Sequence, residues 1–256
     1  MKRRFFYIAG LLGLAIMLPQ FALAQDPLSM TAIRVGQDAD GETTYSLSLQ
    51  ILALMTALTV LPSIVLGMTS FTRIIIVLSI LRQALGTQQT PPNQVLIAIA
   101  LFLTFAIMTP TLTAINDTAL SPYLAEEMSA DAALAQGSTL IKDFMVANTH
   151  TEAVLLFSDM AETGGFTDVS EIPLSVILPA FITSELKTAF QIGFLIFLPF
   201  LVIDMVIASI LMSLGMMMLS PMLISLPFKL LLFVLVDGWT MTVGSLAATF
   251  AMGTGG

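Results

Sequence analysis

The chain has 256 residues, of which 57% are hydrophobic and only 10% are charged, and its mean hydropathy is +0.95. Soluble globular domains carry about 25% charged residues, so this composition excludes a soluble enzyme domain. The formal net charge of −8 argues against nucleic-acid binding, which requires a basic surface. The sequence therefore predicts a membrane protein that is not an enzyme and has no nucleic-acid partner.

The sequence lacks the residue patterns that carry common catalytic or metal chemistry. It has no cysteine and a single histidine, His150, which excludes thiolate zinc sites, iron–sulfur clusters and multi-histidine metal centres. It also has no P-loop, dinucleotide-binding or nucleophile-elbow motif. We expect no catalytic residue, no metal and no cofactor, and we expect His150 to be an ordinary surface residue.

Residues 1–24 have the pattern of a cleaved signal peptide. Basic residues at positions 2–4 precede the apolar stretch Ile8–Leu18, and Ala22-Leu23-Ala24 has the small residues typical of a cleavage site. The alternative is an uncleaved anchor, but 11 helical residues span only about 16 Å of a hydrocarbon core of about 30 Å. We therefore expect cleavage between Ala24 and Gln25.

The first half of the remaining chain is predicted to hold a polar segment and then apolar helices. Turn-forming residues at 25–45 predict an extended N-terminus on the periplasmic side. Residues 46–115 contain three apolar stretches, Ser46–Met68, Phe71–Leu85 and Val95–Ile115, which predict helices. A break rich in Gly, Thr, Gln and Pro separates the last two.

Two arginines mark the second of these helices as unusual for a membrane span. Arg73 and Arg82 are nine residues apart, which places them on opposite helix faces. Each arginine at the bilayer centre costs at least about 2.5–3.5 kcal/mol. We therefore expect this helix at a membrane edge or packed inside a protein assembly.

Residues 116–171 differ from the rest of the chain in composition. They contain ten acidic residues and one basic residue, Lys142, which is too acidic for a cytoplasmic loop. We expect these residues to form an acidic domain in the periplasm. Its larger apolar side chains can pack a small core or an interface between copies: Phe144, Leu155, Leu156, Phe157 and Phe166.

Residues 172–256 are predicted to form a C-terminal helical hairpin. Ile172–Ile192 is moderately apolar and carries Glu185 and Lys187, which are two residues apart and are expected to be structural charges on different helix faces. Phe194–Leu219 and Met222–Val236 form the two arms. Thr240–Met252 is a last, weaker apolar segment.

One charge in each arm points to a buried ion pair. Asp204 lies 12 residues before Met216, and Lys229 lies 11 residues after Met218. In an antiparallel hairpin both charges lie about 17–18 Å from the loop and can face each other. A buried charge needs a partner, so we expect the two to pair. The pair can be purely structural, can relay protons or ions, or can contact another subunit.

The turn between the arms contains Met216, Met217 and Met218 in a row. Methionine is flexible and polarizable, so it packs against varied surfaces. One interpretation is core filling in a chain that has 17 methionines. The other is a soft apolar gasket in a pore, with Gly215 and Pro221 ending the helices on either side.

Helical periodicity without alternating strands predicts an all-α protein of membrane-associated hairpins with a small polar α-helical region. Several long stretches resemble the FliP family of the flagellar and virulence type III secretion systems, and the resemblance covers residues 46–240. The leader over residues 1–24 favours the flagellar branch. The stretches are Gly67–Leu78, Arg82–Gly86, Thr87–Gln94, Pro179–Lys187, Phe197–Asp204, Gly215–Pro221 and Pro227–Lys229.

This resemblance implies a core pore-forming subunit of the flagellar protein export gate, without enzymatic activity. It implies a homo-oligomer of five copies with FliQ and FliR, neighbours FlhA and FlhB, and FliO as an assembly factor. The implied substrates are unfolded rod, hook and filament subunits. The implied location is the bacterial inner membrane in the flagellar basal body, with much of the assembly towards the periplasm.

Two other classes of function are compatible with an apolar helical chain. A secondary transporter would couple Asp204 and Lys229 to ion movement, but the short, proline-interrupted runs show no inverted repeat. A pure assembly scaffold would make no contact with a pore.

Overall fold

The computed structural model describes residues 46–87, 89–164, 166, 171–216 and 218–251. The predicted leader with its cleavage site at Ala24 and Gln25, the segment 25–45, and Met217 lie outside the described residues. The chain forms two compact units, residues 1–60 and residues 61–256. The second unit contains all the functional residues discussed below.

Every regular element of the described residues is helical, so the all-α prediction is confirmed. The order of elements begins α2 (Ser46–Gly67), α3 (Phe71–Ala84), α4 (Asn93–Ile115), the π-helix η1 (Asn116–Leu120) and α5 (Ser121–Leu124). It continues with α6 (Ala130–Ala147), α7 (Thr151–Met160), α8 (Leu174–Ser213), α9 (Pro221–Leu235) and α10 (Gly238–Ala251).

Helix α8 is longer than the sequence predicts, since the sequence indicates two segments, Ile172–Ile192 and Phe194–Leu219. It is a single helix of 40 residues, about 60 Å long at 1.5 Å per residue. Gly193 does not break it, because the missing side chain makes room for α3: a Cβ atom at Gly193 would clash with Ile80. The glycine thus serves close helix packing.

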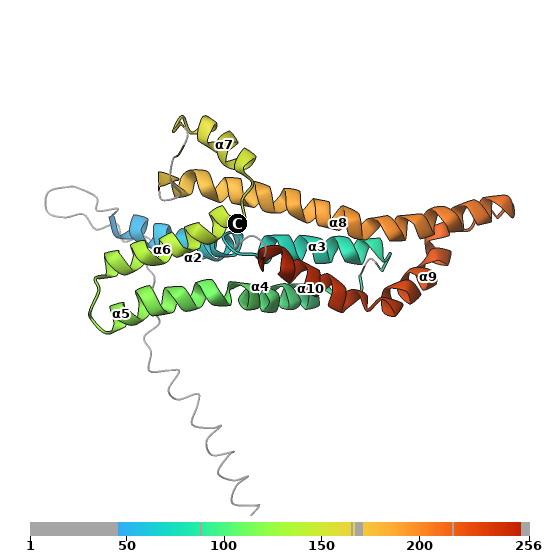
Figure 1. Ribbon diagram of the computed structural model, residues 1–256, viewed down its shortest axis with the longest axis horizontal. Helices are drawn as coiled ribbons and strands as arrows, with labels where there is room; N and C mark the ends of the chain where they lie inside the picture. The colour runs from blue at the N-terminus through green and yellow to red at the C-terminus, as the bar shows by residue number, and fades with distance from the viewer. Residues whose placement is uncertain (1–45, 88, 165, 167–170, 217, 252–256) are drawn as a thin grey trace, which may run out of the picture. The chain divides into compact units, whose positions relative to one another are not determined.

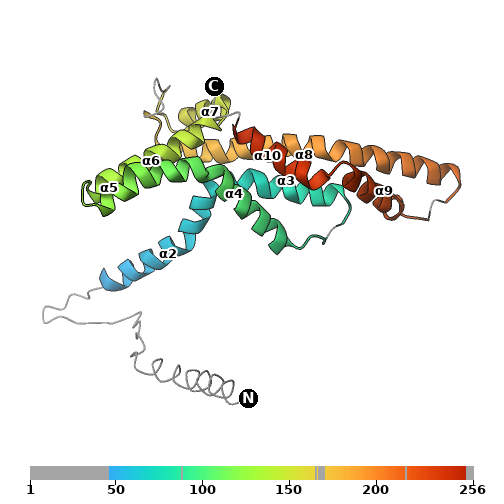
Figure 2. The same cartoon turned by 60° about the horizontal axis from the view of Figure 1, so that its bottom comes forward.

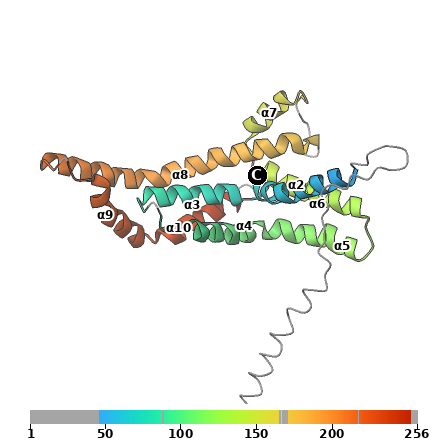
Figure 3. The same ribbon diagram turned by 180° about the vertical axis from the view of Figure 1, so that it is seen from behind.

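Within the second unit, α3 lies between α8 on one side and α4 with α10 on the other (Figures 1 and 3). The pair α5 and α6 lies at one end of this unit, and the turn between α8 and α9 lies at the other (Figure 1). Helix α7 packs along the N-terminal part of α8 (Figure 2). The long α8 therefore connects the acidic end of the unit with the apolar hairpin.

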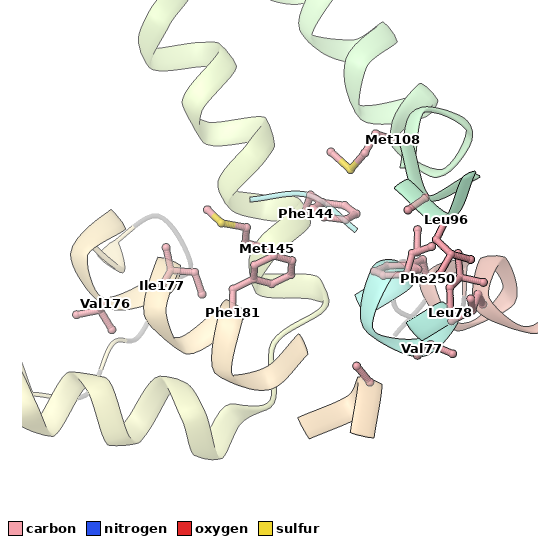
Figure 4. Packing of buried hydrophobic residues seen from close by; sticks show 14 of the residues in the cluster. Val77, Leu78, Leu96, Met108, Phe144, Met145, Val176, Ile177, Phe181 and Phe250 are labelled. Atoms are coloured by element: carbon pink, nitrogen blue, oxygen red, sulfur yellow. The ribbon is translucent and has the colours of Figure 1, made fainter. Parts of the chain in front are cut away.

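The main hydrophobic core joins five helices rather than one segment of the chain. Phe144 of α6 contacts Phe181 of α8 edge-to-face and stacks on Phe250 of α10, with ring centroids 6.1 and 6.3 Å apart (Figure 4). Further buried members come from α3 and α4, for example Leu78 and Leu96. Part of the acidic segment 116–171 thus packs into the common core of the second unit.

The other apolar residues of that segment behave differently from Phe144. Phe157 and Phe166 are partly buried against the main core. Leu155 and Leu156 are more than half exposed, at 53% and 54%. The exposed leucines leave one face of α7 without a partner in the single chain.

Two stretches are long and apolar enough to cross a membrane by themselves, Asn93–Leu124 and Leu174–Ser213. Two bent helix pairs raise the number to four if each pair counts as one span. In the C-terminal pair, α9 and α10 meet at a bend of 62°. Membrane-spanning helices are consistent with the strongly apolar composition.

Candidate functional site

The structure brings Asp204 and Lys229 together at the base of the α8–α9 hairpin. The Lys229 Nζ donates to Asp204 Oδ2 over 2.6 Å and to the main-chain carbonyl of Ala84 over 3.1 Å. The side chain of Lys229 is 3% exposed, and that of Asp204 is 33% exposed. The pair therefore lies at the edge of the packed interior, where α3, α8 and α9 meet.

Sequence reasoning missed a third member of this network, Ser225. Its hydroxyl is fully buried and donates to Asp204 Oδ1 over 2.5 Å, so both carboxylate oxygens of Asp204 have a donor. Ser225 precedes Lys229 by four residues and lies on the same face of α9. That spacing is the signal that could have revealed it.

The position of Lys229 also suits the end of α3. Ala84 is the last residue of α3, and carbonyl groups in the last helical turn have no partner within the helix. A cation there is favoured by the helix dipole. One lysine thus neutralises a carboxylate on α8 and caps a helix that is far away in sequence.

The predicted gasket loop lies beyond this network, between Ser213 and Pro221. Gly215 has a φ of +70°, a backbone conformation that glycine adopts without strain. Met216 is 45% exposed and Met218 is fully exposed. Neither side chain belongs to a hydrophobic cluster of the described residues, so the loop presents apolar, flexible side chains outside the packed hairpin.

A second buried ion pair joins α3 to α8 in the main core. Arg73 and Glu185 are 112 residues apart and pair through two hydrogen bonds, one of them 2.8 Å from Nε to Oε2. The Arg73 guanidinium also donates to Thr249 Oγ1 over 3.0 Å and lies 3.8 Å from the Phe250 ring centroid. Arg73 therefore holds α10 as well as α8.

The remaining predicted charges tie neighbouring elements together. Arg82 lies away from Arg73 and donates to the Pro91 carbonyl over 3.2 Å and to Asn93 Oδ1 over 2.6 Å, which links the end of α3 to the start of α4. The Arg82 Nε atom is buried without a hydrogen-bond partner among the described residues. Among the described groups that join α3 to α4, this N–H is the one without a hydrogen-bond partner.

Helix α7 is attached to α8 by polar contacts at its beginning. Lys187 Nζ donates to Glu152 Oε2 over 3.0 Å at the surface. This hydrogen bond and the lysine charge hold the pKa of Glu152 below its usual range. His150 is exposed as expected, but it also contacts α8: its main-chain N–H donates to Ser184 Oγ, and its ring Nε2 lies 3.2 Å from Thr188 Oγ1.

The described residues contain no group of three or more His, Asp or Glu side chains placed to hold a metal ion. The polar side chains of the hairpin instead form hydrogen bonds with one another, since Ser225 and Lys229 both donate to Asp204. Their arrangement can fix the position of a helix and a loop.

The profile of the FliP family matches residues 54–246, which include both buried ion pairs and the methionine loop. The chain belongs to the FliP family. A flagellar biosynthetic protein FliP of Cereibacter sphaeroides is 70% identical over 213 residues, which is 83% of this chain and 71% of that protein.

More distant members of the family show the same relationship. The flagellar biosynthetic protein FliP of Pectobacterium carotovorum is 53% identical over 82% of each chain. That of Bacillus subtilis is 52% identical over 85% of this chain and 98% of its own length. The matched region therefore extends over nearly all of the described helices.

Proposed function

We propose that this FliP-family chain is a pore-forming subunit of the flagellar protein export gate in the inner membrane. The observation that carries the proposal is the loop with Met216 and Met218, whose exposed side chains project beyond a hairpin anchored by Asp204, Ser225 and Lys229. Several copies around one axis would turn this loop into an apolar ring.

A ring of this kind meets the physical needs of a protein-conducting channel. A pore wide enough for an unfolded chain leaks ions when it is empty, unless an apolar constriction removes water from it. The constriction must also adapt to many side chains, which methionine does through its unbranched thioether chain. Met216, Met217 and Met218 are the residues that we assign to this gasket.

The exposed apolar surface supports assembly with other subunits. Large apolar side chains along α8 and α9, such as Phe194, Leu223 and Leu231, are more than 60% exposed in the single chain. Exposed apolar patches of this extent mark protein or membrane contacts. We propose five copies with FliQ and FliR, near FlhA and FlhB, assembled with the help of FliO and conducting unfolded flagellar subunits.

The proposed position of the gate is the basal body, with the acidic end of the second unit towards the periplasm. The described part of residues 116–171 carries exposed acidic side chains and few basic ones, which is unfavourable on the cytoplasmic side of the membrane. In this arrangement the chain conducts and seals, and it performs no catalytic step.

The test uses a strain of a flagellated bacterium that lacks its own copy of this gene. Complementation with the full chain should restore swimming and the secretion of hook protein. A variant with Met216, Met217 and Met218 all changed to Ala should assemble but raise the ion conductance of the membrane and slow growth. Conductance at the level of the unchanged chain, in an assembled gate, would rule out the gasket.

The matched control changes three exposed methionines outside the loop, Met205, Met212 and Met241, to Ala. It removes the same number of thioethers and should leave conductance unchanged. Reconstitution of the purified chain alone separates the gate from a transporter, because a transporter moves a small solute without FliQ or FliR, whereas a gate subunit does not.

A further inference from the structure

An apolar groove lies between η1–α5 and α6, at the end of the second unit away from the methionine loop (Figure 1). Its volume is about 310 Å³, enough for a large apolar side chain. Leu120 and Tyr123 form one wall, and Leu134 stands on the other. These three side chains are 47%, 44% and 74% exposed, so the groove opens to the outside.

The groove is open because the residues of α6 that form its floor are small. Ala133, Gly137 and Ser138 line it, and a Cβ atom at Gly137 would make only an ordinary contact of 3.8 Å with Ile115. The groove is therefore empty space beside α6 that a side chain could occupy without moving the backbone. It adjoins the main hydrophobic cluster through Ile141, which lines the groove and also packs against that cluster.

Four exposed carboxylates belong to the elements that form this groove or to the turn between them. Asp117, Glu126, Glu127 and Asp131 lie on or directly between the elements that form the groove, and all are exposed. Asp131 lies three residues before Leu134, so the two are neighbours on the surface of α6. The sequence has no basic residue between Arg82 and Lys142, and no ion pair among the described residues neutralises these acids.

We propose that the groove binds an apolar side chain of a basic, amphipathic segment from a different protein. Charge complementarity decides the kind of partner. An apolar side chain would fill the groove while flanking Lys or Arg side chains meet the four carboxylates. The inference does not depend on the export function proposed above.

The charges of the chain argue against the two other occupants of an apolar groove. A second copy has a net charge of −8, and the five basic side chains of its described part all have interaction partners already. A membrane surface with anionic headgroups would be repelled by the same carboxylates. A basic protein segment is the occupant that gains both from the apolar floor and from the acidic residues of the neighbouring elements.

The direct test uses the full chain in detergent and three synthetic helical peptides. The first has leucines flanked by lysines, the second has glutamates in place of the lysines, and the third keeps the lysines but has alanines in place of the leucines. We expect the first to bind most tightly, with an affinity that falls as salt is raised. Equal binding of the first and second peptides, or of the first and third, would overturn the proposal.

Matched variants of the chain locate the binding. Gly137→Leu fills the groove without changing a charge, and we expect it to lower the affinity for the first peptide at least about tenfold. Ala135→Leu adds the same side chain at an exposed position of α6 that does not line the groove, and should have no effect. Asp131→Lys should weaken binding, whereas Asp159→Lys on α7 should not.

Cross-linking in the living cell tests the source of the occupant. A photoreactive residue at position 134 should form an adduct with a second protein that has a basic amphipathic segment, and Gly137→Leu should abolish this adduct. An adduct between two copies of this chain, or one with lipid, would show that the groove has a different occupant and overturn the proposal.

Discussion

The two halves of α8 have similar sequences but different surroundings. Both are strongly apolar, with two charged residues in the first half and one in the second, yet eight of the ten buried residues of this helix precede Phe194. The first half packs against α3 and α7 and holds Glu185 fully buried against Arg73. In the second half only Phe200 and Leu211 are buried, and Asp204 remains 33% exposed.

This difference separates a folding core from an assembly surface. Most of the first half is packed within one chain, because eight of its residues are buried there and Glu185 is paired with Arg73, although Phe190 remains 61% exposed. The second half keeps an apolar surface that needs lipid or other subunits. Its position is fixed by the Asp204–Ser225–Lys229 network and by a small apolar cluster that contains Phe200 and Phe233. Apolar helix faces specify their axial alignment weakly, so polar contacts are well suited to set it.

The largest effect is expected from breaking the ion pair in the first half. Glu185→Ala leaves Arg73 buried without its carboxylate, and removing one partner of a buried pair costs about 3–5 kcal/mol. We expect loss of the folded protein, measured as its steady-state amount and its thermal unfolding temperature. Replacing both residues, Arg73→Met with Glu185→Leu, should restore much of the stability. A stable Glu185→Ala protein would contradict this picture.

The equivalent change in the second half should be milder. Lys229→Ala leaves a carboxylate that is partly exposed, so we expect a cost of about 2–3 kcal/mol, below the range for a fully buried pair. The subunit should fold but lose secretion, measured as exported hook protein. The exchange Asp204→Lys with Lys229→Asp should restore secretion only in part, because an aspartate at 229 would face the Ala84 carbonyl.

Gly193 at the border between the two halves tests the close contact with α3. Gly193→Ala should destabilise the protein by about 1–3 kcal/mol because the added methyl group clashes with Ile80. Adding Ile80→Val should recover part of the loss. Gly244→Ala is the control, since no atom lies within 4 Å of the added group, and it should be neutral or stabilising. Equal effects of both glycine changes would disprove the packing role.

Ser225→Ala measures the contribution of the hydroxyl to the network in the second half. Loss of a hydrogen bond to a charged group costs about 1.5–3 kcal/mol, and solvent access to Asp204 places the expected value near the lower limit. Ser225→Thr should keep more activity than Ser225→Ala. The control Ser209→Ala removes a hydroxyl that bonds only to its own helix and should change neither secretion nor unfolding temperature.

The smallest effect concerns the surface pair of Lys187 and Glu152 in the first half. The pKa of Glu152 is lowered in the folded protein, so the pair stabilises α7 above the usual glutamate range, and this contribution is lost as the pH falls through the lowered pKa. Unfolding temperatures of the unchanged chain and Glu152→Gln should differ slightly at neutral pH and converge in acid. A difference that grows in acid would contradict the assignment.

Some of the fold follows from local sequence alone. The helices over Phe71–Ala84 and Pro221–Leu235 agree with their apolar patterns to within one residue. The two charges in the hairpin arms lie 12 and 11 residues from the methionine turn, so simple helix geometry anticipated their contact. The family followed from long stretches of sequence that match the family profile.

Other features depend on segments that are far apart in the chain. Nothing local links Arg73 to Glu185 or to Thr249, because these side chains meet only after α3, α8 and α10 pack together. The sequence places Gly193 between two apolar stretches, and only the approach of Ile80 shows why a residue without a side chain fits there. The acidic segment differs from the rest of the chain in composition, and only the packing shows that Phe144 of this segment joins residues of four other helices in one core.

The sequence by itself therefore determined the helical class, the family and the hairpin charges, because these depend on composition, on helical spacing and on contiguous stretches of residues. The tertiary structure decided which charges are satisfied inside one chain and which apolar faces remain open. It also revealed the groove beside Gly137, whose walls come from separate helices. Burial depends on contacts between distant segments, and hydropathy cannot distinguish an apolar side chain in a core from one on an open helix face.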